Sequence, residues 1–464
     1  MSSSQPFTAI PPHVHLIGIG GIGVSGVARA LLALGHKVSG SDVRESQLTT
    51  ALRNEGATVT IGHHVDNLAG ADLVVLSTAI PETNPELIGA HAQGIEVRHR
   101  SEVLGAVLDT REIAVGVIGT HGKGTVSSCI TWILETAGLK PGFIIGGMLE
   151  NMAKANSRLT ESPYLVAEVD ESDGSLTNVR PTLAVINNLE ADHLNYYDSL
   201  EHVQDTVVAA LNNNPRLERV FLNIDDAGAL ALKDRIAAPV TTFGQNIAAD
   251  VRGVDAQANI DGGSFLLSAH GQDHGLLKTT LPGLYNLENA LAATSVALHL
   301  SVPIAAIEKA LHSFSGLENR FTVVQAGGRK IIKDYISHPT GIRRVLTAAA
   351  SDNTPITAVF KPYRFTMINY LQDDYAVAFK DAHRTVITEL YTAGEVPIPG
   401  IDTEFLCNKI RGQGSEVTYV QAIEDIIGHL HETVQAGEQV IFFGGDDLFQ
   451  IADRYAAALT ERAS

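Results

Sequence analysis

Residues 119–125, GTHGKGT, carry the clearest chemical pattern in the sequence. They follow the apolar run IAVGVI and precede an amphipathic stretch, which is the order of strand, turn and helix in a phosphate-binding loop. Backbone amides of such a loop point at phosphate oxygens, and Lys123 supplies positive charge to the oxygens that gain charge during phosphoryl transfer. We predict that phosphates are bound by Gly119, Thr120, His121, Gly122, Lys123, Gly124 and Thr125.

Acidic side chains gather at the end of a second apolar run, YLVAEVDESD, and a third run, LAVINNLEADH, ends in Asp192 and His193. In an open parallel sheet the ligand crevice lies beyond the carboxyl ends of the strands, so these groups and the phosphate loop should converge. Oxygen ligands suit Mg²⁺. The alternative interpretation is that the acidic cluster is only a solvated surface and that the histidine has an ordinary polar partner. The acidic cluster consists of Glu168, Asp170, Glu171 and Asp173.

A glycine turn near the N-terminus, formed by Gly18, Gly20 and Gly23, fits the pattern G-x-G-x-x-G between a strand and a helix. Such a turn lets backbone amides approach a diphosphate, and Asp42, at the end of the next strand, could accept a ribose hydroxyl. Taken alone, this pattern indicates a nicotinamide-dependent dehydrogenase. Because a second nucleotide loop follows, we favour a nucleotide other than a nicotinamide cofactor at this turn. The purely structural alternative is that the glycines only allow the helix and the strand to pack closely.

Three series of short β-branched runs that alternate with helical patterns must position these groups, which predicts an α/β fold with parallel sheets. Glycine-punctuated runs at residues 251–283 predict β-hairpins inserted into the second series. The predicted domains are an N-terminal Rossmann-like domain at 1–110, a central P-loop ATPase-like domain at 111–318 and a C-terminal Rossmann-like domain at 319–464.

Composition limits the partners of this chain of 464 residues. The net charge is −19 and no basic stripe occurs, so nucleic acid and anionic membranes are not expected partners. No apolar run approaches the ~20 residues that span a bilayer, and residues 1–12 lack the regions of a signal peptide. Two cysteines, Cys129 and Cys407, cannot form a disulfide framework. We expect a cytoplasmic enzyme that is a monomer or a homodimer.

Ordered motifs along essentially the whole chain resemble the Mur ligases, and most of all their alanine-adding members. The resemblance implies three domains that bind a UDP-sugar, ATP and an amino acid. It also implies amide formation driven by ATP and Mg²⁺ in peptidoglycan precursor synthesis. The carboxylate of UDP-N-acetylmuramate would become an acyl phosphate, from which the amine of L-alanine displaces phosphate. The motifs are HVHLIGIGGIGVSG, TAIPETNPE, GTHGK, AEVDESD, NLEADHLNYY, PGLYNLENALAA, NRF, DYISHPT and TAGEVPIPGID.

The resemblance assigns roles around ATP to matching residues. Lys123 would contact the transferring phosphate, and Glu168 and His193 would bind Mg²⁺. Asn286 and Asn289, one helical turn apart, would face the nucleotide, although helix capping is their plain alternative. Two residues would reach ATP from the third domain after domain closure, which also keeps water from the acyl phosphate: Arg320 and Asp334.

The same resemblance divides the substrate contacts between the two outer domains. Tyr335, His338 and Arg364 would bind the amino acid. The catalytic set that it implies is Lys123, Glu168, His193, Arg320 and His338. The residues expected at the UDP-sugar are Gly18, Gly20, Gly21, Gly23, Asp42, Ser77 and Asn84.

One departure from the family pattern concerns the metal. The alanine-adding ligases have threonine after the loop lysine, where this chain has Gly124. The loop resembles the GKGS loop of the folylpolyglutamate synthetases, in which the hydroxyl comes one residue later. Thr125 would then join Glu168 and His193 as a metal ligand.

Three further departures fall in the third domain. Ser337 and Gly341 replace a histidine and a glutamate, Tyr363 and Met367 replace a histidine and an arginine, and a late glycine turn reads GGDD. Arg364 remains as a carboxylate partner, and Lys361 is a further candidate. The simpler interpretation of these departures is neutral sequence drift in an enzyme that still adds alanine. The alternatives are a related ligase that couples another amine or acid in another pathway, and a non-catalytic nucleotide-binding protein.

Overall fold

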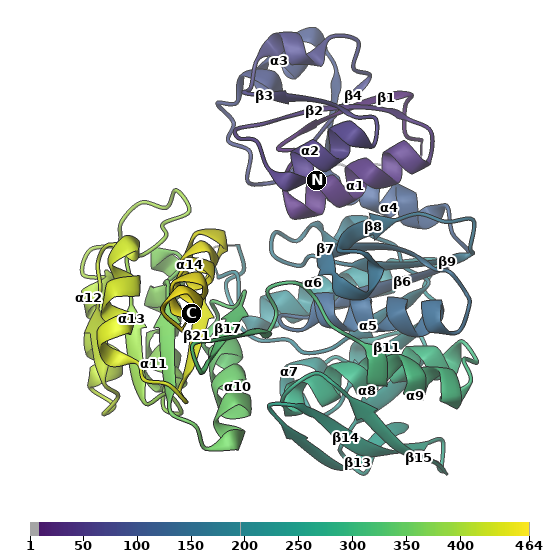
Figure 1. Ribbon diagram of the computed structural model, residues 1–464. Helices are drawn as coiled ribbons and strands as arrows, with labels where there is room; N and C mark the ends of the chain where they lie inside the picture. The colour runs from purple at the N-terminus through teal and green to yellow at the C-terminus, as the bar shows by residue number, and fades with distance from the viewer. Residues whose placement is uncertain (1–8, 195, 464) are drawn as a thin grey trace.

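The computed structural model describes residues 9–194 and 196–463, which form three sheets flanked by helices (Figure 1). Each sheet belongs to one α/β domain, and the sheets consist mainly of parallel strands. The predicted fold class is therefore confirmed. In the described part of the chain, every helix is too short or too polar to cross a membrane.

The N-terminal sheet has the strand order β3-β2-β1-β4-β5, with all neighbours parallel. Strand β1 is buried along its whole length, as expected for a strand covered on both faces. The strands are β1 (His13–Ile17), β2 (Lys37–Asp42), β3 (Thr58–Ile61), β4 (Leu73–Leu76) and β5 (Glu96–His99). The helices are α1 (Ile22–Ala33), α2 (Gln47–Asn54), α3 (Pro85–Gln93) and α4 (Arg100–Asp109).

The central sheet has ten strands in the order β15-β14-β13-β12-β11-β10-β6-β9-β7-β8. The strands from β12 to β7 in this order are parallel neighbours, so their carboxyl ends share one edge. The strands are β6 (Ile113–Ile118), β7 (Gly142–Leu149), β8 (Ala155–Arg158), β9 (Tyr164–Glu168), β10 (Leu183–Ile186), β11 (Arg219–Asn223) and β12 (Val240–Gly244). The helices are α5 (Lys123–Thr136), α6 (Leu200–Asn212), α7 (Ala227–Leu230), α8 (Leu284–His299) and α9 (Ile304–Ser313).

The predicted hairpins extend one side of this sheet. Strands β13 (Val251–Asn259), β14 (Gly262–Ala269) and β15 (Gln272–Thr279) pair in antiparallel order. Glycine-containing turns join them, because tight reversals between adjacent strands favour residues that adopt positive φ.

The third sheet has the order β16-β17-β21-β18-β19-β20 and is parallel except for β16. The strands are β16 (Thr322–Ala326), β17 (Arg329–Asp334), β18 (Ile356–Phe360), β19 (Arg384–Ile387), β20 (Val417–Tyr419) and β21 (Gln439–Phe443). The helices are α10 (Pro339–Ala349), α11 (Phe365–Ala378), α12 (Thr403–Arg411), α13 (Ile426–Thr433) and α14 (Asp446–Ala463).

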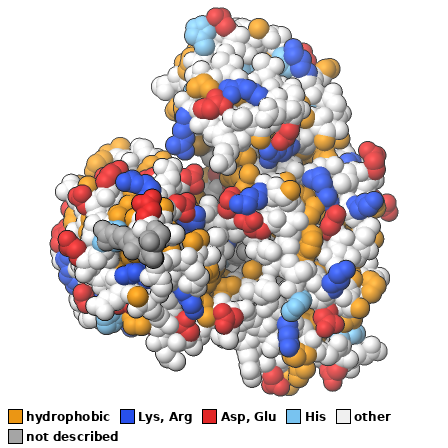
Figure 2. All heavy atoms as spheres, viewed as in Figure 1, with side chains coloured by type: hydrophobic (Ala, Val, Ile, Leu, Met, Phe, Trp, Pro, Cys, Tyr) orange, Lys and Arg blue, Asp and Glu red, His pale blue; other side chains and the backbone are white. Residues whose placement is uncertain are grey.

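The first two domains share one apolar cluster, whereas the buried apolar clusters of the third domain belong to that domain, with Ile260 and Tyr285 of the central domain packed against one of them. Buried side chains of β1 and α1 belong to the same cluster as those of β9 and β10. Apolar clusters on both faces of the third sheet consist of buried side chains of that domain alone. The third domain stands beside the other two, and Figure 2 shows a cleft between them. A substrate bound there would touch two separately built units.

Candidate active site

Lys123 lies at the start of α5, directly after the glycine turn that ends β6. Its ammonium group donates to the carbonyl of Gly119 at 2.6 Å and to Oε1 of Glu171 at 2.8 Å. Burial acts to lower the pKa of Lys123, but the carboxylates of Glu171 and Glu168 more than offset this and raise the pKa above its ordinary value. The lysine is therefore cationic and already held at the loop.

The four acidic residues of the predicted cluster have different partners. Glu171, only 3 % exposed at its side chain, pairs with Lys123. Glu168 accepts the backbone N–H of Gly146 at 2.9 Å and lies beside the loop. Asp170 and Asp173 contact the N-terminal domain instead. The sequence could not single out Glu171, because only the turn of the backbone after β9 decides which carboxylate faces the lysine.

His193 completes this group beyond the end of β10. Its backbone is left-handed, with φ of 54°, and Nε2 lies 3.9 Å from Oε1 of Glu171 and 3.6 Å from Oδ2 of Asp192. Among the described residues, none donates a hydrogen bond to Oε2 of Glu171, which is buried. Lys123, Glu168 and His193 are thus gathered at one edge of the central sheet, as the parallel strand order predicts.

A chain of amides supports the phosphate loop from behind. Asn289 Nδ2 donates to Asn286 Oδ1 at 3.0 Å, and Asn187 Nδ2 donates to Asn289 Oδ1 at 2.9 Å. Gly122 has φ of 80°, and a Cβ there would lie 2.5 Å from Asn289 Oδ1. The two asparagines of α8 are therefore buried behind the loop in this structure and do not cap the helix. Their contact with a nucleotide stays a prediction.

Other loop residues are tied to the segment after β10. Thr120 accepts the N–H of Glu190 at 2.9 Å through its hydroxyl, and the N–H of His121 donates to Asn188 Oδ1 at 2.7 Å. Thr125 is half-buried in the first turn of α5. The loop is thus fixed by hydrogen bonds from the neighbouring strand end.

Leu317 explains why position 124 has no side chain. A Cβ on Gly124 would lie 2.8 Å from Cδ1 of Leu317 and 3.3 Å from Oε2 of Glu168. Leu317 is 5 % exposed and belongs to the segment between α9 and β16 that leads to the third domain. The neighbouring Glu318 donates its N–H to the carbonyl of Met148 at 2.9 Å, which anchors this segment to β7. A larger residue at 124 would require Leu317 to move.

The first glycine turn is closed by its predicted acidic partner. The N–H of Gly20 donates to Oδ2 of Asp42 at 2.9 Å, and Gly18 has φ of 73°. Gly21 precedes α1 as its N-cap residue, and Ser77 is half-buried after β4. Contact of these residues with a UDP-sugar stays a prediction.

Asn84 is buried and caps α3. Its Oδ1 accepts the N–H groups of Glu86 at 2.9 Å and Leu87 at 3.3 Å. The sequence contains this signal, since Asn before Pro and Glu is a typical helix start. The cap gives Asn84 a structural role, and its contact with the UDP-sugar stays a prediction.

Arg100 is a residue that the sequence pattern did not reveal. Its guanidinium pairs with Asp170, and Nη1 lies 3.2 Å from the position that a Cβ on Gly23 would take. Burial opposes ionisation of Asp170, but Arg100 and Lys123 hold its pKa at about 2. Arg100 therefore joins the first glycine turn to the acidic loop of the central domain. No local motif marks such an interdomain contact.

Arg320 and Asp334 lie where the chain enters the third domain. Nη1 of Arg320 lies 3.9 Å from Oδ1 of Asp334, donates to the carbonyl of Tyr335, and the guanidinium stands over the Tyr335 ring at 5.6 Å. Asp334 accepts the N–H of Phe321 at 3.1 Å. Burial raises the pKa of Asp334 to about 7, with Arg320 acting in the opposite direction. The structure brings this predicted pair together, and its contact with ATP stays a prediction.

Arg364 lies beyond the end of β18 with φ of 62°, and its guanidinium stands over the Tyr363 ring at 5.1 Å. Nη1 is 3.9 Å from Oε1 of Glu395, and among the described residues nothing accepts a hydrogen bond from the buried Nε. Tyr363 stacks on Tyr391, with ring centroids 5.7 Å apart. Arg364 thus keeps hydrogen-bonding capacity for a ligand carboxylate.

Two departures from the family pattern in this region have structural explanations. The ammonium group of Lys361 pairs with Oδ2 of Asp447 at 2.5 Å, so a neighbouring carboxylate neutralises the lysine charge. Met367 packs against the apolar core of the domain. Neither residue substitutes for a free arginine.

The glycine at 341 also has a structural explanation, which is the neighbouring Ile336. A Cβ on Gly341 would lie 2.7 Å from Cγ2 of Ile336, so the isoleucine fills the space beside the start of α10. Ser337 contributes its carbonyl, which accepts the hydroxyl of Tyr375 at 2.6 Å. His338 is the N-cap residue of α10 and faces His121 and Glu190 of the central domain.

Comparison with known proteins agrees with this architecture. Residues 13–112 match the family model described as Mur ligase family, catalytic domain, residues 117–297 match the Mur ligase middle domain, and residues 319–445 match the Mur ligase, glutamate ligase domain. The chain is 38 % identical to the UDP-N-acetylmuramate–L-alanine ligase of Syntrophotalea carbinolica, covering 97 % of this chain and 98 % of the relative. For the ligase of that name from Geobacter sulfurreducens the identity is 37 %, with coverage of 97 % and 98 %.

Solved structures show the same arrangement. The UDP-N-acetylmuramate–alanine ligase of Thermotoga maritima superposes with a TM-score of 0.81 at 25 % identity, covering 97 % of this chain and 99 % of the other. A murein peptide ligase from Psychrobacter arcticus shares the fold with a TM-score of 0.73 at 23 % identity, covering 97 % and 99 %. Fold and phosphate site define a three-domain, ATP-dependent ligase. The chain belongs to the Mur ligase family.

Proposed function

We propose that the protein joins UDP-N-acetylmuramate to L-alanine, with ATP cleaved to ADP and phosphate, in peptidoglycan precursor synthesis. The observation that carries the ligase chemistry is the half-buried Lys123, held with Glu171 and His193 at the edge of the central sheet that faces the third domain. The near full-length similarity to ligases of that name supports the substrates. Since UDP-sugars and ATP are intracellular metabolites, we place this reaction in the cytoplasm.

The proposed reaction has two steps. The lactyl carboxylate attacks the γ-phosphorus of ATP, and ADP leaves, which gives an acyl phosphate. The amine of L-alanine then adds to the acyl carbon, and phosphate leaves as the amide forms, with one amine proton released. Lys123 stabilises the negative charge on the phosphoryl oxygens, and Arg364 orients the amino-acid carboxylate. Contact between the third domain and the phosphate loop would exclude water from the acyl phosphate.

Thr125, Glu168 and His193 are the residues that we propose for Mg²⁺. The donor set fits a hard cation, because Glu168 and Thr125 offer oxygen and the buried Oε2 of Glu171 has no hydrogen-bond partner in the described part of the chain. When bound, Mg²⁺ neutralises charge on the phosphates. Glu171 is a further candidate beside these three, since it lies 3.9 Å from His193.

A phosphate-release screen of the purified protein tests the proposal. ATP, Mg²⁺ and UDP-N-acetylmuramate are supplied with each proteinogenic amino acid in turn, and omission of the UDP-sugar is the control. We expect L-alanine to give the highest rate. A rate with L-alanine that equals the rate without any amino acid would contradict the proposal.

A related ligase that adds a different amino acid is the second candidate. It is favoured by the third domain, where Lys361 is neutralised by Asp447 and Met367 is packed in the core, so that Arg364 alone remains for the carboxylate. The same screen separates the two candidates. A clear preference for another amino acid would select this second function.

A further inference from the structure

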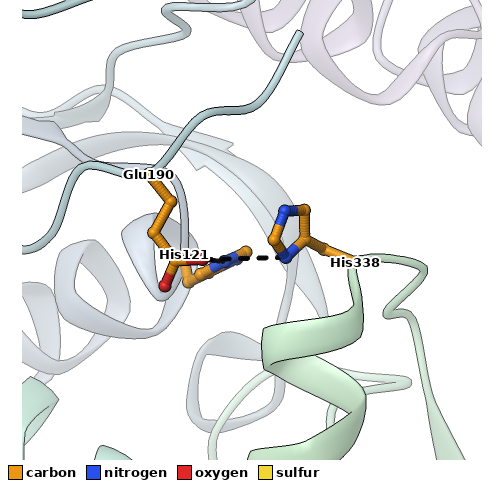
Figure 3. Close-up of side chains that lie close together, drawn as sticks. All are labelled: His121, Glu190 and His338. Carbon is orange, nitrogen blue, oxygen red and sulfur yellow. Dashed lines mark ion pairs between the residues drawn. The ribbon is translucent and has the colours of Figure 1, made fainter. Parts of the chain in front are cut away.

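Three side chains meet where the third domain touches the phosphate loop (Figure 3). His121 comes from the loop, Glu190 from the segment after β10, and His338 from the start of α10. One donor atom of each residue lies within 4.8 Å of the other two. The imidazole rings are 4.7 Å apart between centroids, with His338 almost completely buried.

Hydrogen bonding accounts for only part of this group. Nδ1 of His338 accepts the N–H of Thr340 at 3.3 Å, whereas its Nε2 is buried without a partner among the described residues. His121 Nε2 lies 3.6 Å and His338 Nδ1 lies 3.9 Å from Oε2 of Glu190, and both distances exceed that of a hydrogen bond. Nε2 of His121 is buried, and among the described residues it has no hydrogen-bond partner. The carboxylate oxygen instead accepts the hydroxyl of Thr340 at 2.7 Å. Two imidazoles and a carboxylate are thus brought together, with one buried ring nitrogen of each histidine left unpaired among the described residues.

The spacing and the chemistry of the three donors suit a metal ion. Zinc binds nitrogen and oxygen at about 2.0 to 2.2 Å in a tetrahedron, which places the donors about 3.4 Å apart. The distances from Oε2 of Glu190, 3.6 Å to Nε2 of His121 and 3.9 Å to Nδ1 of His338, differ from this by a few tenths of an ångström. The two imidazole donors lie within 4.8 Å of each other, and an ion at Nδ1 of His338 would replace the N–H of Thr340 there. Two nitrogen donors favour zinc-type ions over Mg²⁺, which prefers oxygen. Thr340 is placed to orient the carboxylate, as outer partners of metal ligands do.

We propose that His121, Glu190 and His338 bind a divalent transition-metal ion of the zinc type, which links the phosphate loop to the third domain. The site is distinct from the residues proposed for Mg²⁺, and the inference does not depend on the proposed substrates. Because the ligands come from two domains, a bound ion holds these domains in contact. Domain separation would then require the loss of at least one metal bond.

Titration of the full-length protein with Co²⁺, in the absence of nucleotide and Mg²⁺, tests the site directly. Cobalt is a spectroscopic substitute for zinc, and its visible absorption reports a site of low coordination number. We expect the absorption to saturate at one equivalent and to disappear when Zn²⁺ is added. Absence of a saturable band, together with no heat of Zn²⁺ binding in calorimetry, would overturn the proposal.

The variants are chosen to preserve the fold. Glu190→Gln keeps an acceptor for Thr340, and His338→Asn keeps an acceptor for the N–H at the start of α10. Since loss of an outer partner alone weakens metal binding by about 10- to 100-fold, we expect each of these to weaken Co²⁺ binding by at least about 100-fold and Thr340→Val by about tenfold. His312→Ala, an exposed histidine on α9, is the control and should bind as the unmodified protein does.

The variant His193→Ala distinguishes this site from the site proposed for Mg²⁺, to which His193 belongs. Unchanged Co²⁺ affinity in this variant supports the proposal, because His193 is not one of the three ligands. Loss of binding in His193→Ala with retention in Glu190→Gln and His338→Asn would place the ion at the other site and overturn the inference.

Discussion

The edge of the central sheet and the crevice of the third domain both lie beyond the carboxyl ends of parallel strands, yet they differ in how their charges are satisfied. In the central domain, Lys123 is half-buried and paired with the buried Glu171. In the third domain, Arg364 stacks on Tyr363, approaches Glu395 only to 3.9 Å and retains a buried Nε without a partner in the described residues. The same topological rule therefore produces a candidate phosphate site whose cation is already paired and a candidate carboxylate site whose cation has no close carboxylate partner among the described residues.

This difference separates a feature that every ligase of this kind needs, the cation at the phosphate, from one that varies with the substrate, the group that binds the amino acid. Any ATP-dependent ligase needs a cation at the transferring phosphate. The group that recognises the amino acid can change with the substrate, and here Tyr363 and Met367 depart from the family pattern while Arg364 remains. Substitutions at the two sites should consequently affect different kinetic parameters.

The largest effect is expected for Lys123→Ala. Removal of this ammonium group takes away charge stabilisation at the transferring phosphate, so phosphate release should fall by roughly a hundredfold to a thousandfold or more. UDP-sugar binding, measured by calorimetry, should remain nearly unchanged, because we assign it to the N-terminal domain. The exposed Lys309→Ala is the control. Equal loss of both properties would contradict the assignment of two separate nucleotide sites.

Arg364→Ala should act mainly on the amino acid. A charge-assisted hydrogen bond contributes about 1.5 to 3 kcal/mol, so KM for the amino acid should rise roughly 10- to 100-fold. The KM for ATP should change far less, as initial rates at varied ATP would show. Arg343→Ala, exposed on α10, is the matched control. A rise in KM for ATP of the same size would remove the distinction between the two sites.

Thr125→Ala and Ser127→Ala compare two hydroxyls of α5. Thr125 is half-buried at the loop, whereas Ser127 is fully buried along the helix. If Thr125 provides an oxygen to Mg²⁺, its loss should raise the Mg²⁺ concentration needed for half-maximal rate by roughly five- to tenfold, about the value of one polar contact. Ser127→Ala should leave that concentration almost unchanged. Indistinguishable Mg²⁺ titrations would mean that the loop supplies no hydroxyl to the metal.

The smallest effect concerns stability at the entrance to the third domain. The pKa of Asp334 is raised to about 7, so the folded protein retains a proton that the unfolded chain loses above about pH 4. Stability from this group is therefore present below about pH 4 and is lost as the pH rises to about 7. The denaturant midpoint of Asp334→Asn should therefore rise relative to that of the unmodified protein between about pH 4 and about pH 7. A constant difference would mean that Asp334 titrates normally.

The sequence was sufficient for the fold and for much of the phosphate side. Strand alternation predicted the three α/β series and the inserted hairpins, and the parallel order explains why Lys123, Glu168 and His193 meet. Partners set by tertiary packing could not be predicted. Arg100 reaches Asp170 across two domains. The pairing of Glu171 with Lys123 depends on the conformation of the loop after β9, which cannot be read from a cluster of four acidic residues in the sequence.

Leu317 has a further consequence for how the phosphate loop can change over evolutionary time. Its Cδ1 lies 2.8 Å from the position that a Cβ at residue 124 would take, so a threonine there requires the leucine side chain to shift. The two positions are therefore coupled. A hydroxyl directly after the lysine is tolerated only together with another rotamer or another residue at 317, in the segment that leads into the third domain.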